Sequence, residues 1–273
     1  MEGYKMSLNT VEILGIPITS TSPDQVLREL TVFVAKPASS EKSSGRSSFG
    51  LTIFTPNPEF LVRAGEDSSF RKLLKEADIN FPDGIGLVWA SKILGTPIKE
   101  RISGADIVEK LLEIGNGRLG WVIGIVGARR GVLSESQELV ARLEVKYPHL
   151  QFINLDEPEL KIKNLEFKIV MACHGMEKQE KWIWENAYGR PSSAKATAGT
   201  VKANVFMGIG GSLDFITGFA KRAPVWMQRI GLEWLWRGLQ RPEHFKRIWK
   251  AVFVFGWLVI KEKLNIFFRL DSQ

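Results

Sequence analysis

The stretch at positions 77–90, ADINFPDGIGLVWA, decides the fold of this chain. The short run at 79–81 predicts a strand, Pro-Asp-Gly predicts a sharp turn, and a helical apolar period continues to Leu94. Asp83 therefore stands at the carboxyl end of a strand. In an open parallel sheet these ends border the ligand crevice, so Asp83 is placed to take a proton from a bound hydroxyl. The structural alternative is that Asp83 caps the helix, because Asp is a preferred N-cap residue.

Strands and helices alternate on both sides of this turn. An entering strand or hairpin is expected at 11–19, and further strands at 51–55, 79–81, 119–126, 150–155, 167–173 and 201–207. Helices are expected between them, the first at 23–35 with Ser22 as its N-cap. The alternation predicts an α/β fold with a Rossmann-like open, mostly parallel sheet and helices on both faces. Right-handed crossovers place the turns after the strands at one edge.

The positive charge of the chain is concentrated at its end. The 273 residues carry a net charge of +7, and residues 218–273 hold eleven Lys or Arg against four Asp or Glu, so the first 217 residues are neutral. Five of the nine Trp also lie in this tail. We therefore expect two parts, a Rossmann-like catalytic domain at 1–217 and a basic, Trp-rich helical C-terminal appendage at 218–273. Polar, low-complexity loops are expected at 36–49 and 189–200.

Composition excludes several protein classes. The lone Cys173 rules out a disulfide framework and a Cys-based metal site. The N-terminus lacks the pattern of a signal peptide, and the longest uncharged apolar run, 251–260, is about half of the ~20 residues that span a bilayer. The sequence thus predicts a cytoplasmic protein that does not cross the membrane.

Polar or glycine-rich segments follow several of the predicted strands. They include TPNP at 55–58, GARRG at 127–131 and GIGG at 208–211. Small residues between a strand and a helix let backbone N–H groups approach phosphate. Neither the G-x-G-x-x-G nor the Walker spacing fits, so no single turn identifies a nucleotide site. Ser103 is expected to cap a helix in a capping box with Asp106. Arg101 lies just before this helix and is positioned to meet an anion. The alternative is that Arg101 is a solvated surface arginine.

The ordered set of motifs is more specific than any one of them. The set comprises TPNPE at 55–59, FPDGIG at 81–86, RISGAD at 101–106, VGARRGV at 126–132, KQEKW at 178–182, GIGGSLDF at 208–215, RAP at 222–224 and GLEWLWR at 231–237. Together they resemble the WecG/TagA/CpsF glycosyltransferase family over nearly the whole chain. The resemblance implies an inverting enzyme that moves an N-acetylmannosamine-type sugar from UDP to polyprenyl-diphosphate-linked N-acetylglucosamine, in wall teichoic acid or other cell-surface polysaccharide synthesis. One departure is His174-Gly175-Met176-Glu177, where the family usually has Gly-x-Pro before Lys-Gln-Glu.

The resemblance also implies roles for individual residues. Asp83 becomes the catalytic base, with Thr55 beside it in the acceptor or sugar pocket. The remaining substrate-binding positions, which line the donor site and surround the nucleotide, are Asn57, Arg101, Gly127, Gln179, Glu180, Gly208, Gly210 and Gly211. No Asp-x-Asp occurs in the chain, so we expect no metal and no cofactor, with helix N-termini and Arg101 stabilising the departing UDP. The scattered His149, His174 and His244 are expected to be ordinary surface or capping residues.

The tail has the pattern of an interfacial helix, in which Trp and Arg recur at helical spacing. It is expected to contact an anionic membrane surface, or the acceptor diphosphate, through Arg222, Arg229, Arg237, Arg241 and Arg247. The alternative is a solvated helix face above a core stripe. Nucleic acid also accepts such charge, but no recognisable nucleic-acid motif is present. The expected location is therefore peripheral, at the inner face of the bacterial cell membrane.

Two other functions stay open. A non-catalytic membrane-binding scaffold would not need Asp83. A Rossmann oxidoreductase would carry G-x-G-x-x-G near the first strand, whereas the glycines here follow the last strand. The sequence leaves the oligomeric state open, with a homo-oligomer among the options, and it does not identify the sugar.

Overall fold

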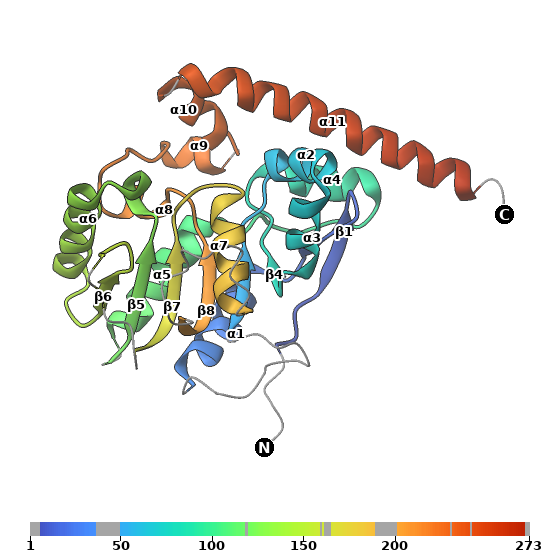
Figure 1. Cartoon of the computed structure of the whole chain (residues 1–273). Helices are drawn as coiled ribbons and strands as arrows, with labels where there is room; N and C mark the ends of the chain where they lie inside the picture. Colours follow the sequence, from blue (N-terminus) through green and yellow to red (C-terminus); the bar gives the residue numbers. More distant parts are fainter. Residues whose placement is uncertain are drawn as a thin grey trace.

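A computed structural model describes residues 6–36, 50–117, 120–158, 160, 165–188, 201–229, 231–240 and 242–270. The sheet at its centre has six strands in the order β4-β3-β8-β7-β5-β6, and every described pair is parallel (Figure 1). The strands are β3 (Leu51–Phe54), β4 (Ile79–Asn80), β5 (Val122–Val126), β6 (Gln151–Asn154), β7 (Glu166–Ala172) and β8 (Lys202–Gly208). The predicted α/β fold with a Rossmann-like parallel sheet is confirmed. Of the polar loops expected at 36–49 and 189–200, all residues except Lys36 lie outside the described residues.

Helices cover both faces of the sheet. One face packs against α1 (Pro23–Ala35), α5 (Gly104–Asn116), α6 (Leu133–Lys146) and the five-residue α8 (Ser212–Ile216). The other packs against α2 (Pro58–Glu66), α3 (Ser68–Glu76), α4 (Ile85–Leu94) and α7 (Lys178–Ala187). Strand residues alternate between the two cores, so the strands read as continuous apolar runs, as expected for a sheet buried on both sides.

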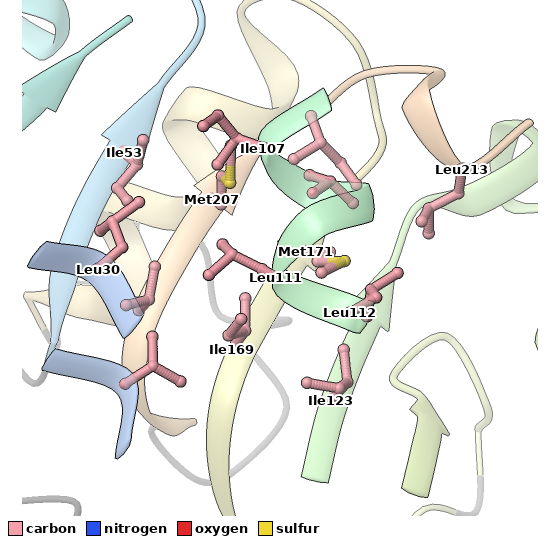
Figure 2. Packing of buried hydrophobic residues seen from close by; sticks show 14 of the residues in the cluster. Leu30, Ile53, Ile107, Leu111, Leu112, Ile123, Ile169, Met171, Met207 and Leu213 are labelled. Carbon is pink, nitrogen blue, oxygen red and sulfur yellow. The ribbon is translucent and has the colours of Figure 1, made fainter. Parts of the chain in front are cut away.

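The core under α5 shows how this packing stabilises the fold. Leu111 and Leu112 of α5 lie over Ile123, Ile169 and Met171 of the central strands, and all five side chains are fully buried (Figure 2). Each such side chain contributes about 1.5–3 kcal/mol by leaving water. This layer holds the carboxyl ends of β5, β7 and β8 at a common edge.

An antiparallel hairpin precedes the sheet, as predicted. It consists of β1 (Thr10–Ile13) and β2 (Ile16–Thr19), and Leu14 and Gly15 form its turn with φ angles of 51° and 71°. Arg71 of α3 donates a hydrogen bond to the Leu14 carbonyl at 2.8 Å, so the hairpin is tied to the helical layer.

The tail is helical, with α9 (Val225–Arg229), α10 (Glu233–Gln240) and the 29-residue α11 (Pro242–Leu270). The long α11 lies across α2 and α4 (Figure 1). Its buried Ala251, Phe255 and Val259 are spaced four residues apart, and Phe255 and Val259 join the core of that face. Within the described ranges, no helix has a segment both long and apolar enough to cross a membrane. The tail therefore packs on the sheet domain, and the division at residue 217 stays a prediction.

The connections create a crevice between β5 and β7. The chain leaves β5 through α6 towards β6, and it leaves β7 through α7 in the opposite direction towards β8. Because α6 and α7 lie on opposite faces of the sheet, the carboxyl ends of β5 and β7 form a topological switch point. Ligands of open α/β sheets bind at such points.

Candidate active site

A cavity of ≈ 450 Å³ occupies this switch point. Three turns line it: the 3-10 turn η2 (Ala128–Gly131) after β5, the residues that follow β7, and the start of α8 after β8. Its polar lining comes from Arg129, Arg130, Glu135, His174 and Asp214, together with the backbone of Gly210 and Gly211. Of the predicted site residues, only Gly210 and Gly211 line this cavity directly.

Gly127 shapes the cavity from behind. Its φ is 68°, and a Cβ at this position would lie 2.4 Å from Cγ of His174. Its N–H donates a hydrogen bond to the Asp156 carboxylate at 2.7 Å. The site therefore requires glycine on two grounds, the left-handed backbone conformation and the close approach of the imidazole.

His174 is a wall of the cavity, so its expected role as an ordinary surface or capping histidine is wrong. Its ring packs on Trp182, with 6.2 Å between ring centroids. Burial lowers the pKa of His174, although the Asp156 carboxylate opposes the shift. Its buried Nδ1 has no hydrogen-bond partner among the described residues. His174 therefore contributes a neutral ring to the cavity lining and keeps this nitrogen buried.

Two arginines flank the mouth, and the sequence reading missed both. Arg129 and Arg130 have φ angles of 50° and 60°, a conformation that non-glycine residues rarely adopt. Arg129 pairs with Glu135 at 2.8 Å and with Asp214 at 3.3 Å. Arg130 is exposed and forms no ion pair within the described part of the chain. The signal in the sequence was the Arg-Arg pair directly after a buried strand.

Cys173 also lines the cavity. Burial raises the pKa of its thiol far above the ordinary range, so the thiol stays protonated. A protonated thiol is a poor nucleophile.

A polar network adjoins the cavity and joins five predicted residues. The Thr55 hydroxyl of the β3 end donates to the Gly208 carbonyl of β8 at 3.1 Å. Gln179 accepts a hydrogen bond from the Gly210 N–H at 2.9 Å and donates one to Glu180 at 2.6 Å. The structure thus brings Thr55, Gly208, Gly210, Gln179 and Glu180 together, and Gly210 belongs to both network and cavity.

Glu180 is fully buried in this network. Burial raises its pKa to about 7, and hydrogen bonds from Gln179 and from backbone N–H groups oppose the shift. One of those N–H groups belongs to Glu177, 2.7 Å from the Glu180 carboxylate. Glu180 is therefore a carboxyl group that changes charge near neutral pH.

Asp83 reaches the same edge from β4. Its N–H donates to the Pro56 carbonyl at 3.0 Å, which holds it beside the segment that follows Thr55. The N-cap of α4 is Gly84, with a φ of 99°, so the alternative in which Asp83 is the capping residue is wrong. Asp83 is half-buried at this edge, and its role as base stays a prediction.

Asn57 has a structural task. Its side-chain oxygen accepts hydrogen bonds from the N–H groups of Glu59 at 2.9 Å and Phe60 at 3.3 Å, which caps α2. Its predicted contact with the donor stays a prediction.

Arg101 and Arg222 meet an anion within the chain, the carboxylate of Glu233. Arg101 binds one oxygen of Glu233 at 2.5 Å, and Arg222 binds the other at 3.2 Å. Arg222 also pairs with Asp106 at 2.5 Å. Ser103 caps α5 by accepting from the Asp106 N–H at 3.4 Å, but the Asp106 carboxylate binds Arg222, and this corrects the expected capping box. The start of α10 is thus fixed to the edge that carries the site.

The other predicted basic residues are less defined. The backbone of Arg229, Arg237 and Arg247 lies in α9, α10 and α11, while their side chains, and the whole of Arg241, lie outside the described residues. In the part of the chain that the structure describes, no three His, Cys, Asp or Glu residues are grouped so that they could hold a metal ion. Metal independence stays a prediction.

The sequence model of the Glycosyl transferase WecG/TagA/CpsF family matches residues 11–267. The chain belongs to this family. Among its relatives, a Staphylococcus aureus (strain MW2) protein is 28% identical over 266 residues, which cover 94% of each chain. A Bacillus subtilis (strain 168) protein is 28% identical over 224 residues, 79% of this chain and 81% of the relative. Both relatives are named N-acetylglucosaminyldiphosphoundecaprenol N-acetyl-beta-D-mannosaminyltransferase. Membership in the WecG/TagA/CpsF family makes this chain a glycosyltransferase, and the predicted family is confirmed.

Proposed function

We propose that this chain transfers an N-acetylmannosamine-type sugar from a UDP-sugar to a polyprenyl-diphosphate-linked N-acetylglucosamine in the synthesis of wall teichoic acid or another cell-surface polysaccharide. The observation that carries the proposal is the common edge of the sheet, where Asp83 and Thr55 lie beside a polar network that borders the ≈ 450 Å³ cavity. The names of the two relatives supply the substrate classes.

The donor is assigned to the cavity. Arg130, which forms no ion pair with the described residues, supplies positive charge for a diphosphate, whereas the charge of Arg129 is offset by Glu135 and Asp214. Gly210 and Gly211 have no side chains and so allow a ligand to approach the backbone closely, while the Gly210 N–H itself is bound by Gln179. Positive charge held where negative charge develops on the leaving group stabilises the transition state, because the protein groups need not reorganise during the reaction.

The reaction needs one proton transfer and one displacement. Asp83 accepts the proton of the acceptor hydroxyl, whose oxygen then forms a bond to the anomeric carbon of the donor sugar. The bond between that carbon and the UDP oxygen breaks, and UDP leaves with the electron pair. Attack opposite the leaving group inverts the anomeric centre in one step, so no covalent enzyme intermediate forms.

The acceptor is membrane-linked, and α11 offers a surface suited to a bilayer. Large apolar side chains are exposed along it, namely Trp249, Phe253, Trp257, Ile260, Leu264, Phe267 and Phe268. Trp89 and Ile93 of the adjacent α4 are exposed as well. Exposed aromatic residues on a basic helix favour an interfacial position at anionic lipid. We therefore place the protein at the inner face of the bacterial cell membrane.

The test is a transfer assay with a short-chain lipid-diphosphate-N-acetylglucosamine and a panel of UDP-sugars, analysed by mass spectrometry. We expect a product heavier by one N-acetylhexosamine from UDP-N-acetylmannosamine. A different sugar in the product would correct the donor assignment. Absence of transfer from every UDP-sugar would contradict the proposal and favour the membrane-binding scaffold.

A further inference from the structure

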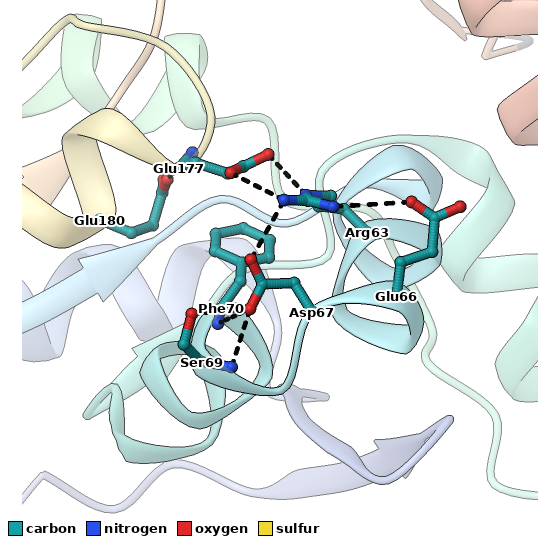
Figure 3. A network of polar contacts seen from close by, with 7 residues as sticks. All are labelled: Arg63, Glu66, Asp67, Ser69, Phe70, Glu177 and Glu180. Atoms are coloured by element: carbon teal, nitrogen blue, oxygen red, sulfur yellow. Dashed lines mark hydrogen bonds and ion pairs between the residues drawn. The ribbon is translucent and has the colours of Figure 1, made fainter.

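An ion pair behind the candidate site links α2 to the start of α7 (Figure 3). The Arg63 guanidinium meets both carboxylate oxygens of Glu177, with Nε 2.7 Å from Oε1 and Nη2 3.3 Å from Oε2. The same guanidinium binds Asp67, the N-cap of α3, at 3.1 Å. Arg63 therefore joins three helix ends on one face of the sheet.

The backbone of Glu177 is held in an uncommon conformation. Its φ is 72° and its ψ is −48°, outside the regions that non-glycine residues normally adopt. Such strain persists only when the surroundings hold it, and it gathers at functional sites. The two hydrogen bonds from Arg63 help to hold this conformation, because they fix the Glu177 side chain to α2, which lies on the same face of the sheet.

Glu177 in turn fixes the buried pair of the network. It is the N-cap of α7 and forms a capping box with Glu180, whose carboxylate accepts the Glu177 N–H at 2.7 Å. Glu180 accepts from Gln179, and Gln179 accepts from the Gly210 N–H at the cavity. A continuous chain of hydrogen bonds thus runs from Arg63 to the cavity wall.

We propose that Arg63 is a positioning residue, which acts through Glu177 to hold Gln179, Glu180 and the Gly210 turn in the geometry that transfer requires. The proposal rests on the proposed function for its effect on turnover. The direct structural effect of Arg63, the ordering of the Gly210 turn, does not depend on the proposed function.

A positioning role of Arg63 can be distinguished experimentally from a purely stabilising role, because the ion pair with Glu177 is partly exposed. The Arg63 and Glu177 side chains retain 35% and 42% of their accessible surface. Pairs this accessible contribute little to global stability, since water and salt screen them. Loss of the pair should therefore affect the site more than the fold.

The experiment compares Arg63→Gln with Lys72→Gln. Lys72 is a matched control, because it forms an exposed i,i+4 ion pair with Glu76 on the neighbouring α3 and, within the described ranges, has no hydrogen bond or ion pair to the network. We expect Arg63→Gln to lower kcat roughly tenfold to a hundredfold, as small displacements in a site do, with an unchanged Tm. Lys72→Gln should keep the wild-type kcat. Wild-type turnover in Arg63→Gln, or an equal loss in Lys72→Gln, would overturn the proposal.

A double-mutant cycle identifies the partner. Glu177→Gln removes the charge and keeps the backbone N–H that binds Glu180. If Arg63 acts through Glu177, the Arg63→Gln/Glu177→Gln double variant should lose no more kcat than either single variant. Fully additive losses would overturn the relay.

Hydrogen exchange provides a readout that does not need turnover. In Arg63→Gln we expect faster exchange in peptides that cover 177–180 and 208–211, with unchanged exchange in β5. Unchanged exchange in both peptides would refute the positioning role. If the wild type transfers no sugar while the exchange result holds, the proposed function fails and the positioning role stands.

Discussion

The Thr55 hydroxyl donates a hydrogen bond to the Gly208 carbonyl across two neighbouring strands, at 3.1 Å. The two residues are 153 positions apart in sequence and close the candidate site between β3 and β8. Gly208 also lies against Gln179 and Glu180, because a Cβ on it would be 3.0 Å from the Gln179 amide nitrogen. Through this contact, the residues proposed for the acceptor side and those proposed for the donor side share one edge of the sheet.

Replacement of Asp83 by Asn should remove most of the turnover and leave UDP binding intact. The amide keeps the size of the side chain but cannot accept the hydroxyl proton, and loss of a general base costs about 10²- to 10⁴-fold in rate. Steady-state kinetics and UDP titration calorimetry measure the two properties. A variant with wild-type kcat would remove Asp83 from the mechanism.

Replacement of Gly127 by Ala should destabilise the protein more than replacement of Gly131. Both glycines have a positive φ, of 68° and 77°, so each substitution carries a strain of about 1–2 kcal/mol. Only the Gly127 Cβ meets another group, the His174 ring at 2.4 Å, whereas nothing lies within 4 Å at Gly131. Urea unfolding should therefore separate the two variants, and UDP affinity should fall in Gly127→Ala alone. Equal unfolding free energies would show that His174 moves aside without cost.

Glu180 should make stability depend on pH between about 4.5 and 7. Its pKa rises from 4.5 to about 7 in the folded protein, so the folded state binds the proton more tightly than the unfolded chain. The contribution of Glu180 to the free energy of unfolding is therefore fully present below pH 4.5 and is lost as the pH rises through 7, by up to about 3 kcal/mol. Unfolding free energies at pH 5 and pH 8 should differ less in Glu180→Gln than in the wild type. The same difference in both proteins would exclude Glu180 as the cause.

Replacement of Phe253 and Trp257 by Ser should weaken binding to anionic liposomes. These side chains are 60% and 66% exposed on α11, so their loss removes apolar surface from the proposed interface without opening the core. Turnover of a soluble short-chain acceptor should stay unchanged. Co-sedimentation of the variant at the wild-type level would contradict the interfacial role of α11. Deletion of the tail is a poorer test, because it uncovers the core partners of Phe255 and Val259.

The sequence predicted those features that depend on local pattern. The strand, turn and helix around Asp83 follow from apolar period and from Pro-Asp-Gly, and the glycine turns follow from the same signals. Long-range pairing was not predictable in this way. His174 is a cavity wall because β7 lies beside β5, and Arg101 binds Glu233 because α10 folds back over the edge. Neither arrangement leaves a periodic or spacing signal near the residue concerned.

The Arg101–Glu233 ion pair also has a consequence for synthesis on the ribosome. Its partners are 132 positions apart, and Glu233 leaves the ribosome only after every strand of the sheet. A nascent chain that has completed the sheet still carries Arg101 and Arg222 without the carboxylate that they share. The edge of the sheet thus acquires its final charge balance late in translation, and a chain released before α10 lacks the Glu233 carboxylate that binds Arg101, while Arg222 keeps its pair with Asp106.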